Sequence, residues 1–121
     1  MDKIYIVVCA KGEYDGHVTF NVAWSDDIVS AEFYARDLED ELNAFDRDHK
    51  AWLELHPPPP QDVIWTPKAN AWHEAAHAEI RRLLAKSSSK FQECVTEYDP
   101  RYDGVWRGRP DFWVTKLDKV P

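Results

Sequence analysis

Two histidines and a glutamate in the middle of the chain have the residue types and the spacing of a zinc hydrolase site. The run His73-Glu74-Ala75-Ala76-His77 matches the HExxH pattern. On a helix this pattern places two imidazoles one turn apart to bind zinc, while the glutamate acts as general base on the bound water. A third protein ligand is also needed, and because no histidine follows the motif the candidates are acidic: Glu93, Glu97, Asp99 and Asp103.

The same two histidines have a second interpretation. His73 and His77 flank the apolar stripe of the helix expected around them, which runs through Trp72, Ala76 and Ile80. Boundary histidines of this kind pack a ring against apolar neighbours and keep one nitrogen in water. We favour this interpretation and keep zinc binding, with Glu74 as the catalytic base, as the alternative.

Arginine and aromatic residues gather in a long expected loop between Asp99 and Pro110, which is the one basic patch of the chain. Arg, Tyr and Trp are the residue types that dominate binding hot spots, although aromatic residues in such a loop can also fold back on the core. The candidate partner-binding residues of this loop are Arg101, Tyr102, Trp106, Arg107 and Arg109.

Acidic residues crowd one side of the first expected helix, and the run Glu39-Asp40-Glu41 lies in the middle of it. Such a side either keeps the protein soluble or enters a basic groove on a partner by imitating the charge spacing of DNA. If it is functional, we expect Glu39, Asp40 and Glu41 to contact the partner.

Composition narrows the class of partner. The chain has 121 residues, 44% of them hydrophobic, and a formal net charge of −7. That charge repels nucleic-acid backbones and anionic membranes, so we expect a protein partner, such as one with a basic nucleic-acid-binding surface. The longest apolar run, Ile4 to Ala10, is too short to span a bilayer, and Cys9 and Cys94 form no CxxC pair. We expect a cytoplasmic protein whose two thiols are free and mostly buried. We expect no bound cofactor, with zinc as the alternative.

Two strands are expected before the helices. Lys3–Ala10 is apolar on both faces, as in a central strand covered on both sides. An Asp15-Gly16 turn signal follows, and then apolar residues alternate at period two, the pattern of one strand face: Val18, Phe20, Val22 and Trp24. Together these segments predict a β-hairpin.

The first helix should begin after Ser25, with Asp26 and Asp27 in its first turn, and should end near Leu55 before a tetraproline. His49 lies on its apolar stripe and is expected to be a core or boundary histidine. The stripe recurs at steps of three and four residues: Ala31, Ala35, Leu38, Leu42, Phe45 and Trp52.

The spacer Pro57–Pro60 should separate this helix from a second one, capped by Thr66, begun at Pro67 and ending near Lys86. Two further strands are predicted, at Gln92–Tyr98 and Asp111–Val120. The sequence therefore predicts a single α+β domain over residues 1–121, in which a small, mainly antiparallel sheet packs against two helices.

The start of the chain resembles a group of small phage and prophage proteins of unknown function. The resemblance is carried by the strand from Tyr5, the turn Gly12-Glu13-Tyr14, the second strand and the helix that opens after Ser25. It implies a mobile-element protein that binds and inhibits a host protein, as anti-defence or anti-CRISPR proteins do. The alternatives that stay open are the zinc hydrolase and a structural or oligomerising module.

Overall fold

The computed structural model describes residues 3–11, 18–59, 66–95, 98 and 109–118. The predicted Asp15-Gly16 turn and the predicted binding residues Arg101, Tyr102, Trp106 and Arg107 lie outside this part of the chain. The described elements are, in order, β1 (Lys3–Lys11), β2 (Val18–Ser25), α1 (Ile28–Leu55), α2 (Pro67–Ala85), α3 (Ser89–Cys94) and β3 (Asp111–Asp118). The α+β class is confirmed.

The strands form an antiparallel sheet in the order β2-β1-β3. The central position of β1, the hairpin with β2 and the strand that begins at Asp111 are therefore confirmed. The sheet joins the first described segment of the chain to the last one, because all of β3 pairs with β1.

The expected alternation along β2 is wrong at Trp24. Phe20 lies opposite Cys9 on β1, whereas Trp24 lies opposite Ile6, because the register shifts by one residue halfway along β1. Strand faces alternate with period two, so one extra residue reverses the alternation. Trp24 therefore lies on the opposite face of the sheet from Phe20 and is 70% exposed.

Helix α1 begins two residues later than predicted, because Asp27 caps it in place of Ser25. Asp27 has an extended backbone, and its Oδ1 accepts a hydrogen bond from the N–H of Val29 at 3.1 Å. Ser25 supports the cap, since its hydroxyl accepts from the N–H of Asp27. The helix ends at Leu55, ahead of the prolines, as predicted.

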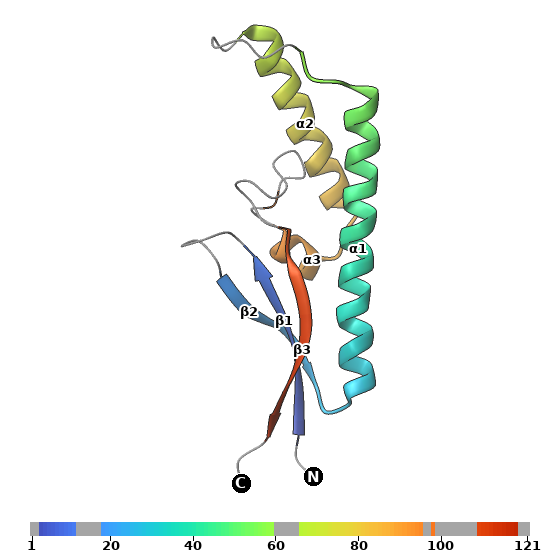
Figure 1. Ribbon diagram of the computed structural model, residues 1–121, viewed down its shortest axis with the longest axis vertical. Helices are drawn as coiled ribbons and strands as arrows, with labels where there is room; N and C mark the ends of the chain where they lie inside the picture. The colour runs from blue at the N-terminus through green and yellow to red at the C-terminus, as the bar shows by residue number, and fades with distance from the viewer. Residues whose placement is uncertain (1–2, 12–17, 60–65, 96–97, 99–108, 119–121) are drawn as a thin grey trace.

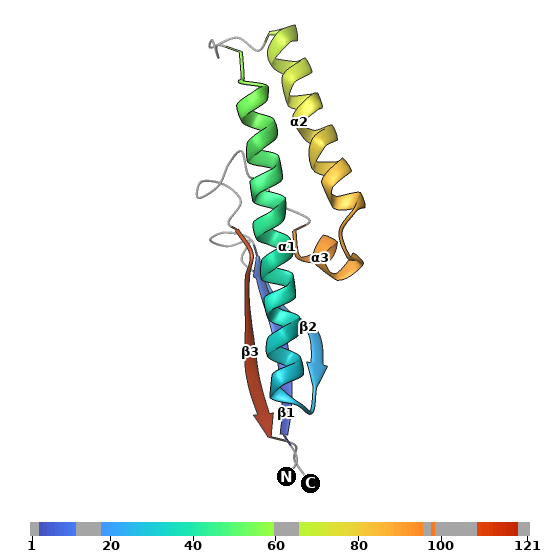
Figure 2. The same cartoon turned by 90° about the vertical axis from the view of Figure 1, so that its right-hand side faces the viewer.

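Helix α1 is longer than the sheet it covers. Its 28 residues span about 42 Å at the usual helical rise. The first half contacts all three strands, and Figure 2 shows it running along the sheet over β1. The second half projects beyond the sheet and pairs with α2, which runs back beside it (Figure 1). The described helices therefore cover only one face of the sheet.

The predicted apolar stripe of α1 forms the main core. Leu42 is fully buried where α1 meets the sheet and α3, and Ala31, Leu38, Phe45 and His49 are also buried. Cys9 and Cys94 are free and fully buried in this core, which confirms the prediction for the thiols.

The second helix is also confirmed, because the Thr66 hydroxyl accepts from the N–H of Ala69 and Pro67 is the first helical residue.

The predicted strand at Gln92–Tyr98 is wrong, since Ser89–Cys94 forms α3 instead. The hydroxyl of Ser88 caps this helix by accepting from the N–H of Phe91 at 3.2 Å. Phe91 and Cys94 lie three residues apart and are both fully buried, which is the spacing of one helix face. Burial of this face against the main core decides between helix and strand.

Candidate functional site

The HExxH residues lie on α2, as predicted. His73 is half-buried and contacts the ring of Trp72 edge-on at 4.8 Å between centroids, whereas Glu74 and His77 are exposed. No cluster of three His, Cys, Asp or Glu side chains suited to a metal ion occurs in the described part of the chain. Of the candidate third ligands, Glu93 lies on α3, and Glu97, Asp99 and Asp103 lie outside the described residues. The zinc site therefore stays a prediction.

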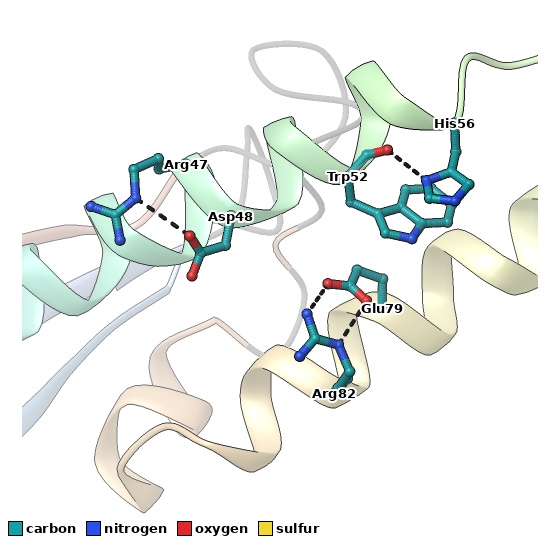
Figure 3. A network of polar contacts seen from close by, with 6 residues as sticks. All are labelled: Arg47, Asp48, Trp52, His56, Glu79 and Arg82. Atoms are coloured by element: carbon teal, nitrogen blue, oxygen red, sulfur yellow. Dashed lines mark hydrogen bonds and ion pairs between the residues drawn. The ribbon is translucent and has the colours of Figure 1, made fainter.

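An aromatic cluster fastens the end of α1 to the start of α2. The His56 ring stacks on Trp52 with 4.4 Å between centroids, and its Nδ1 lies 2.9 Å from the Trp52 carbonyl oxygen (Figure 3). From α2, the Trp72 indole N–H donates to the His56 carbonyl at 2.7 Å. Since His73 packs on Trp72, it extends this cluster, which suits the boundary-histidine interpretation.

A buried polar group lies between the two long helices, beside the aromatic cluster. His49 is fully buried, with its ring between Phe45 and Trp52 at centroid distances of 6.3 and 6.1 Å, so the predicted core histidine is confirmed. Glu79 faces it from α2 and is only 9% exposed. The Arg82 Nε donates to Glu79 Oε2 at 2.8 Å, and its Nη2 pairs with Oε1 (Figure 3).

Arg82 keeps Glu79 ionised in this setting. Its hydrogen bonds lower the pKa of the Glu79 carboxyl, burial opposes them, and electrostatic interactions with Arg82, His49 and Lys86 lower the pKa further. Glu79 is not among the residues predicted from the sequence. The available signal was its spacing, because it falls on the stripe with Ala76 and Leu83 and has an arginine three residues later.

Arg109 is the one candidate binding residue of the predicted Arg and aromatic loop that the structure describes, and it binds α1. Its Nε donates to Asp46 Oδ2 at 2.8 Å, its Nη1 to Glu39 Oε1 at 3.2 Å and its Nη2 to Asn43 Oδ1 at 2.6 Å. The Tyr98 hydroxyl donates to the other Asp46 oxygen at 2.7 Å. We call these five residues the Arg109 clamp.

The clamp joins two regions that were predicted as separate surfaces, the Arg and aromatic loop and the acidic side of α1. Partial burial disfavours the charge on Arg109, but the hydrogen bonds of Asp46 and Glu39 outweigh it, and the pKa of the guanidinium is raised. Of the other predicted acids, Glu41 accepts a hydrogen bond from the Ser88 hydroxyl at 3.0 Å. Only Asp40 of the predicted run is without an intramolecular partner among the described residues.

Asp40 belongs instead to a group on the exposed side of α1. Glu32, Asp37 and Asp40 are all exposed and make no ion pair with another described residue. We call these three carboxylates the acidic ridge. They spread over about 12 Å of helix axis at the usual rise per residue.

The face of the sheet opposite α1 was not predicted as a surface, since β1 was expected to be covered on both sides. Ile4, Ile6 and Val8 point to this face, and Trp24, Trp113 and Leu117 lie opposite them on the outer strands. Trp24, Trp113 and Leu117 are 70%, 42% and 53% exposed. Val8 and Ala10, at the Lys11 end of this face, are buried, so its exposed part lies around Ile4, Ile6 and Trp24. We call this exposed part the open face.

A pocket of about 360 Å³ lies on the open face along β1 and β2, lined by Ile4, Ile6, Asn21, Val22, Ala23 and Trp24. Its lining is uncharged, and the exposed indole of Trp24 forms one side of it.

Comparisons of the chain with protein-family models, with curated proteins and with solved structures found no match. None of the described helices combines the length and the apolar composition that a membrane crossing requires.

Proposed function

We propose that this chain is an accessory protein of the phage type that acts by binding a host protein with a basic surface. The observation that carries this proposal is the acidic ridge, in which Glu32, Asp37 and Asp40 stand exposed along one side of α1. Fixed carboxylates on a helix attract a positively charged groove and orient it during association.

The surroundings of the ridge support this use. The Arg109 clamp neutralises Glu39 and Asp46 internally, so the two acids next to β3 are occupied by the fold. The cap at Asp27 and the packing of α1 on three strands hold the helix rigid beneath the ridge. Because the backbone beneath the ridge is already ordered, binding costs entropy mainly in the side chains.

The class of partner follows from the charge balance. With a net charge of −7, the chain is repelled by nucleic acid and attracted to the proteins that bind nucleic acid. Inhibition of a nucleic-acid-handling or defence complex is the biological role that suits both this charge and the resemblance at the start of the chain.

Affinity purification from host lysate tests the proposal. At physiological salt we expect the immobilised chain to retain a specific protein with a basic surface, and we expect about 0.5 M salt to release it, since exposed charges are screened. Retention of no specific protein would overturn the proposal. A partner that stays bound at high salt would remove the acidic ridge from the mechanism.

A further inference from the structure

We propose that Cys9 and Cys94 form a reversible disulfide bond when a hydroperoxide oxidises the protein. The bond joins β1 to α3 across the main core, and it is a modification of the fold itself. The inference concerns neither the acidic ridge nor the open face, and it does not depend on the proposed function.

The two thiols come from distant parts of the chain and meet in the core. Cys9 lies on the central strand between Phe20 on β2 and Phe112 on β3, and Cys94 is the last residue of α3. Both cysteines are fully buried in the same hydrophobic cluster, and α3 packs beside β1 (Figure 1). Their side chains hydrogen-bond to each other. A small movement of α3 toward the strand therefore brings the two sulfurs to bonding distance.

A second contact holds α3 against the strand next to the thiols. The Lys11 Nζ donates a hydrogen bond to the backbone carbonyl of Glu93 at 2.9 Å. Lys11 follows Cys9 by two residues on the same strand, and Glu93 directly precedes Cys94. The backbone beside one thiol is thus fastened to the strand that carries the other.

The surroundings of the pair give the two cysteines different roles. The hydrogen bond from Cys9 lowers the pKa of the Cys94 thiol, burial opposes this effect, and the charge of Lys11 adds to it. The same hydrogen bond raises the pKa of Cys9, and burial raises it further. Because the thiolate is the nucleophile in sulfur chemistry, Cys94 reacts first with an oxidant and Cys9 reacts second.

The reaction balances with one molecule of hydrogen peroxide. The Cys94 thiolate attacks one peroxide oxygen, the O–O bond breaks, and the hydroxide that leaves takes up the proton that Cys94 released. The Cys9 sulfur then attacks the sulfenic acid on Cys94, the S–O bond breaks, and the oxygen leaves as water with the Cys9 proton. Two thiols are oxidised to a disulfide, and the peroxide is reduced to two waters.

Helix α3 gives the oxidant access to the buried pair. It has six residues, and so short a helix is stable only while it is packed. Opening of α3 alone therefore costs less free energy than unfolding of the domain, and it exposes Cys94 to a molecule as small as hydrogen peroxide. The chain has two cysteines, so this is the one disulfide that can form within it.

Treatment of the full chain with about 1 mM hydrogen peroxide tests the proposal. We expect a monomer lighter by two hydrogen atoms, in which neither cysteine reacts with a maleimide after denaturation. Dithiothreitol should restore both thiols. Since the bond closes a loop of about 85 residues, the melting temperature of the oxidised protein should rise by at least about 5 °C.

Cys9→Ala and Cys94→Ala are the matched controls. Each leaves one thiol with no second cysteine in its chain, so the same treatment should leave the melting temperature of the monomer without this rise. The parent protein alone decides the main question, whether or not the two variants fold.

Two maleimide-reactive thiols per chain after the treatment would overturn the inference. So would a disulfide that forms only between chains. A disulfide within the chain that lowers the melting temperature would also overturn it, because the native positions of the two sulfurs would then not fit the bond.

Discussion

At the scale of single residues, Glu79 shows how a polar side chain can be kept in an apolar interface. It lies on the buried side of α2, where Ala76, Ile80 and Leu83 surround it in sequence and His49 faces it from α1. Burial of an unpaired carboxylate is costly, and the paired hydrogen bonds from Arg82 offset that cost. Glu79 therefore belongs to the structure of the helical hairpin.

This setting predicts the response of the hairpin to acid. The folded-state pKa of Glu79 lies below its usual value of 4.5, so its contribution to stability is complete above that value and is lost as pH falls through the lower folded pKa. We expect the melting temperature to fall below about pH 4.5 and to fall less steeply in Glu79→Gln. Thermal unfolding followed by circular dichroism at several pH values measures how steeply the melting temperature falls with pH in each protein. If the melting temperature fell equally steeply in parent and variant, Glu79 would not contribute to the acid dependence of stability.

The core positions on both long helices could be predicted from local sequence. The stripe of α1, the burial of His49 and the Thr66-Pro67 start of α2 each depend on residues within a turn or two of one another. Predictions of this kind are correct because helix periodicity and capping depend only on residues close together in the sequence.

At the scale of elements, the Arg109 clamp determines how β3 meets α1. Arg109 comes two residues before β3 and reaches Asp46, 63 residues earlier in the chain, while its side chain is 31% exposed. Charged hydrogen bonds in a partly buried setting are stronger than surface ion pairs. The clamp therefore fixes the first residues of β3 against the middle of the helix.

Replacement of Arg109 should measure this contribution. We expect Arg109→Gln to lower the free energy of unfolding by about 1 to 3 kcal/mol, since it leaves Asp46 and Glu39 without their cation. Arg47→Gln is the control, because the Arg47 and Asp48 side chains are 75% and 50% exposed and their pair should contribute nothing measurable. Urea unfolding of the parent and both variants measures the loss of unfolding free energy that each substitution causes. Equal losses would show that the clamp is only a surface contact.

Long-range and register effects explain what the sequence could not predict at this scale. Nothing near Arg109 indicates a partner on α1, and the one-residue shift that turns Trp24 outward depends on the pairing of β2 with β1. The short helix α3 had a local signal in Ser88, but its apolar residues also suited a strand until burial of Phe91 and Cys94 was known.

At the scale of the whole molecule, α1 separates two surfaces with different chemistry. The acidic ridge is charged and lies on the exposed side of α1, whereas the open face is uncharged and lies on the side of the sheet away from α1. Figure 2 shows α1 in front of the sheet.

The most direct measurement of the central claim is the affinity of the captured partner for a ridge variant. Glu32→Lys, Asp37→Lys and Asp40→Lys together reverse the acidic ridge. The matched control reverses three exposed acids outside α1: Asp26, Glu74 and Glu93. We predict that the ridge variant binds at least about tenfold more weakly at physiological salt, while the control, which has the same net charge, loses much less. Equal affinities of the two variants would contradict a role for the acidic ridge.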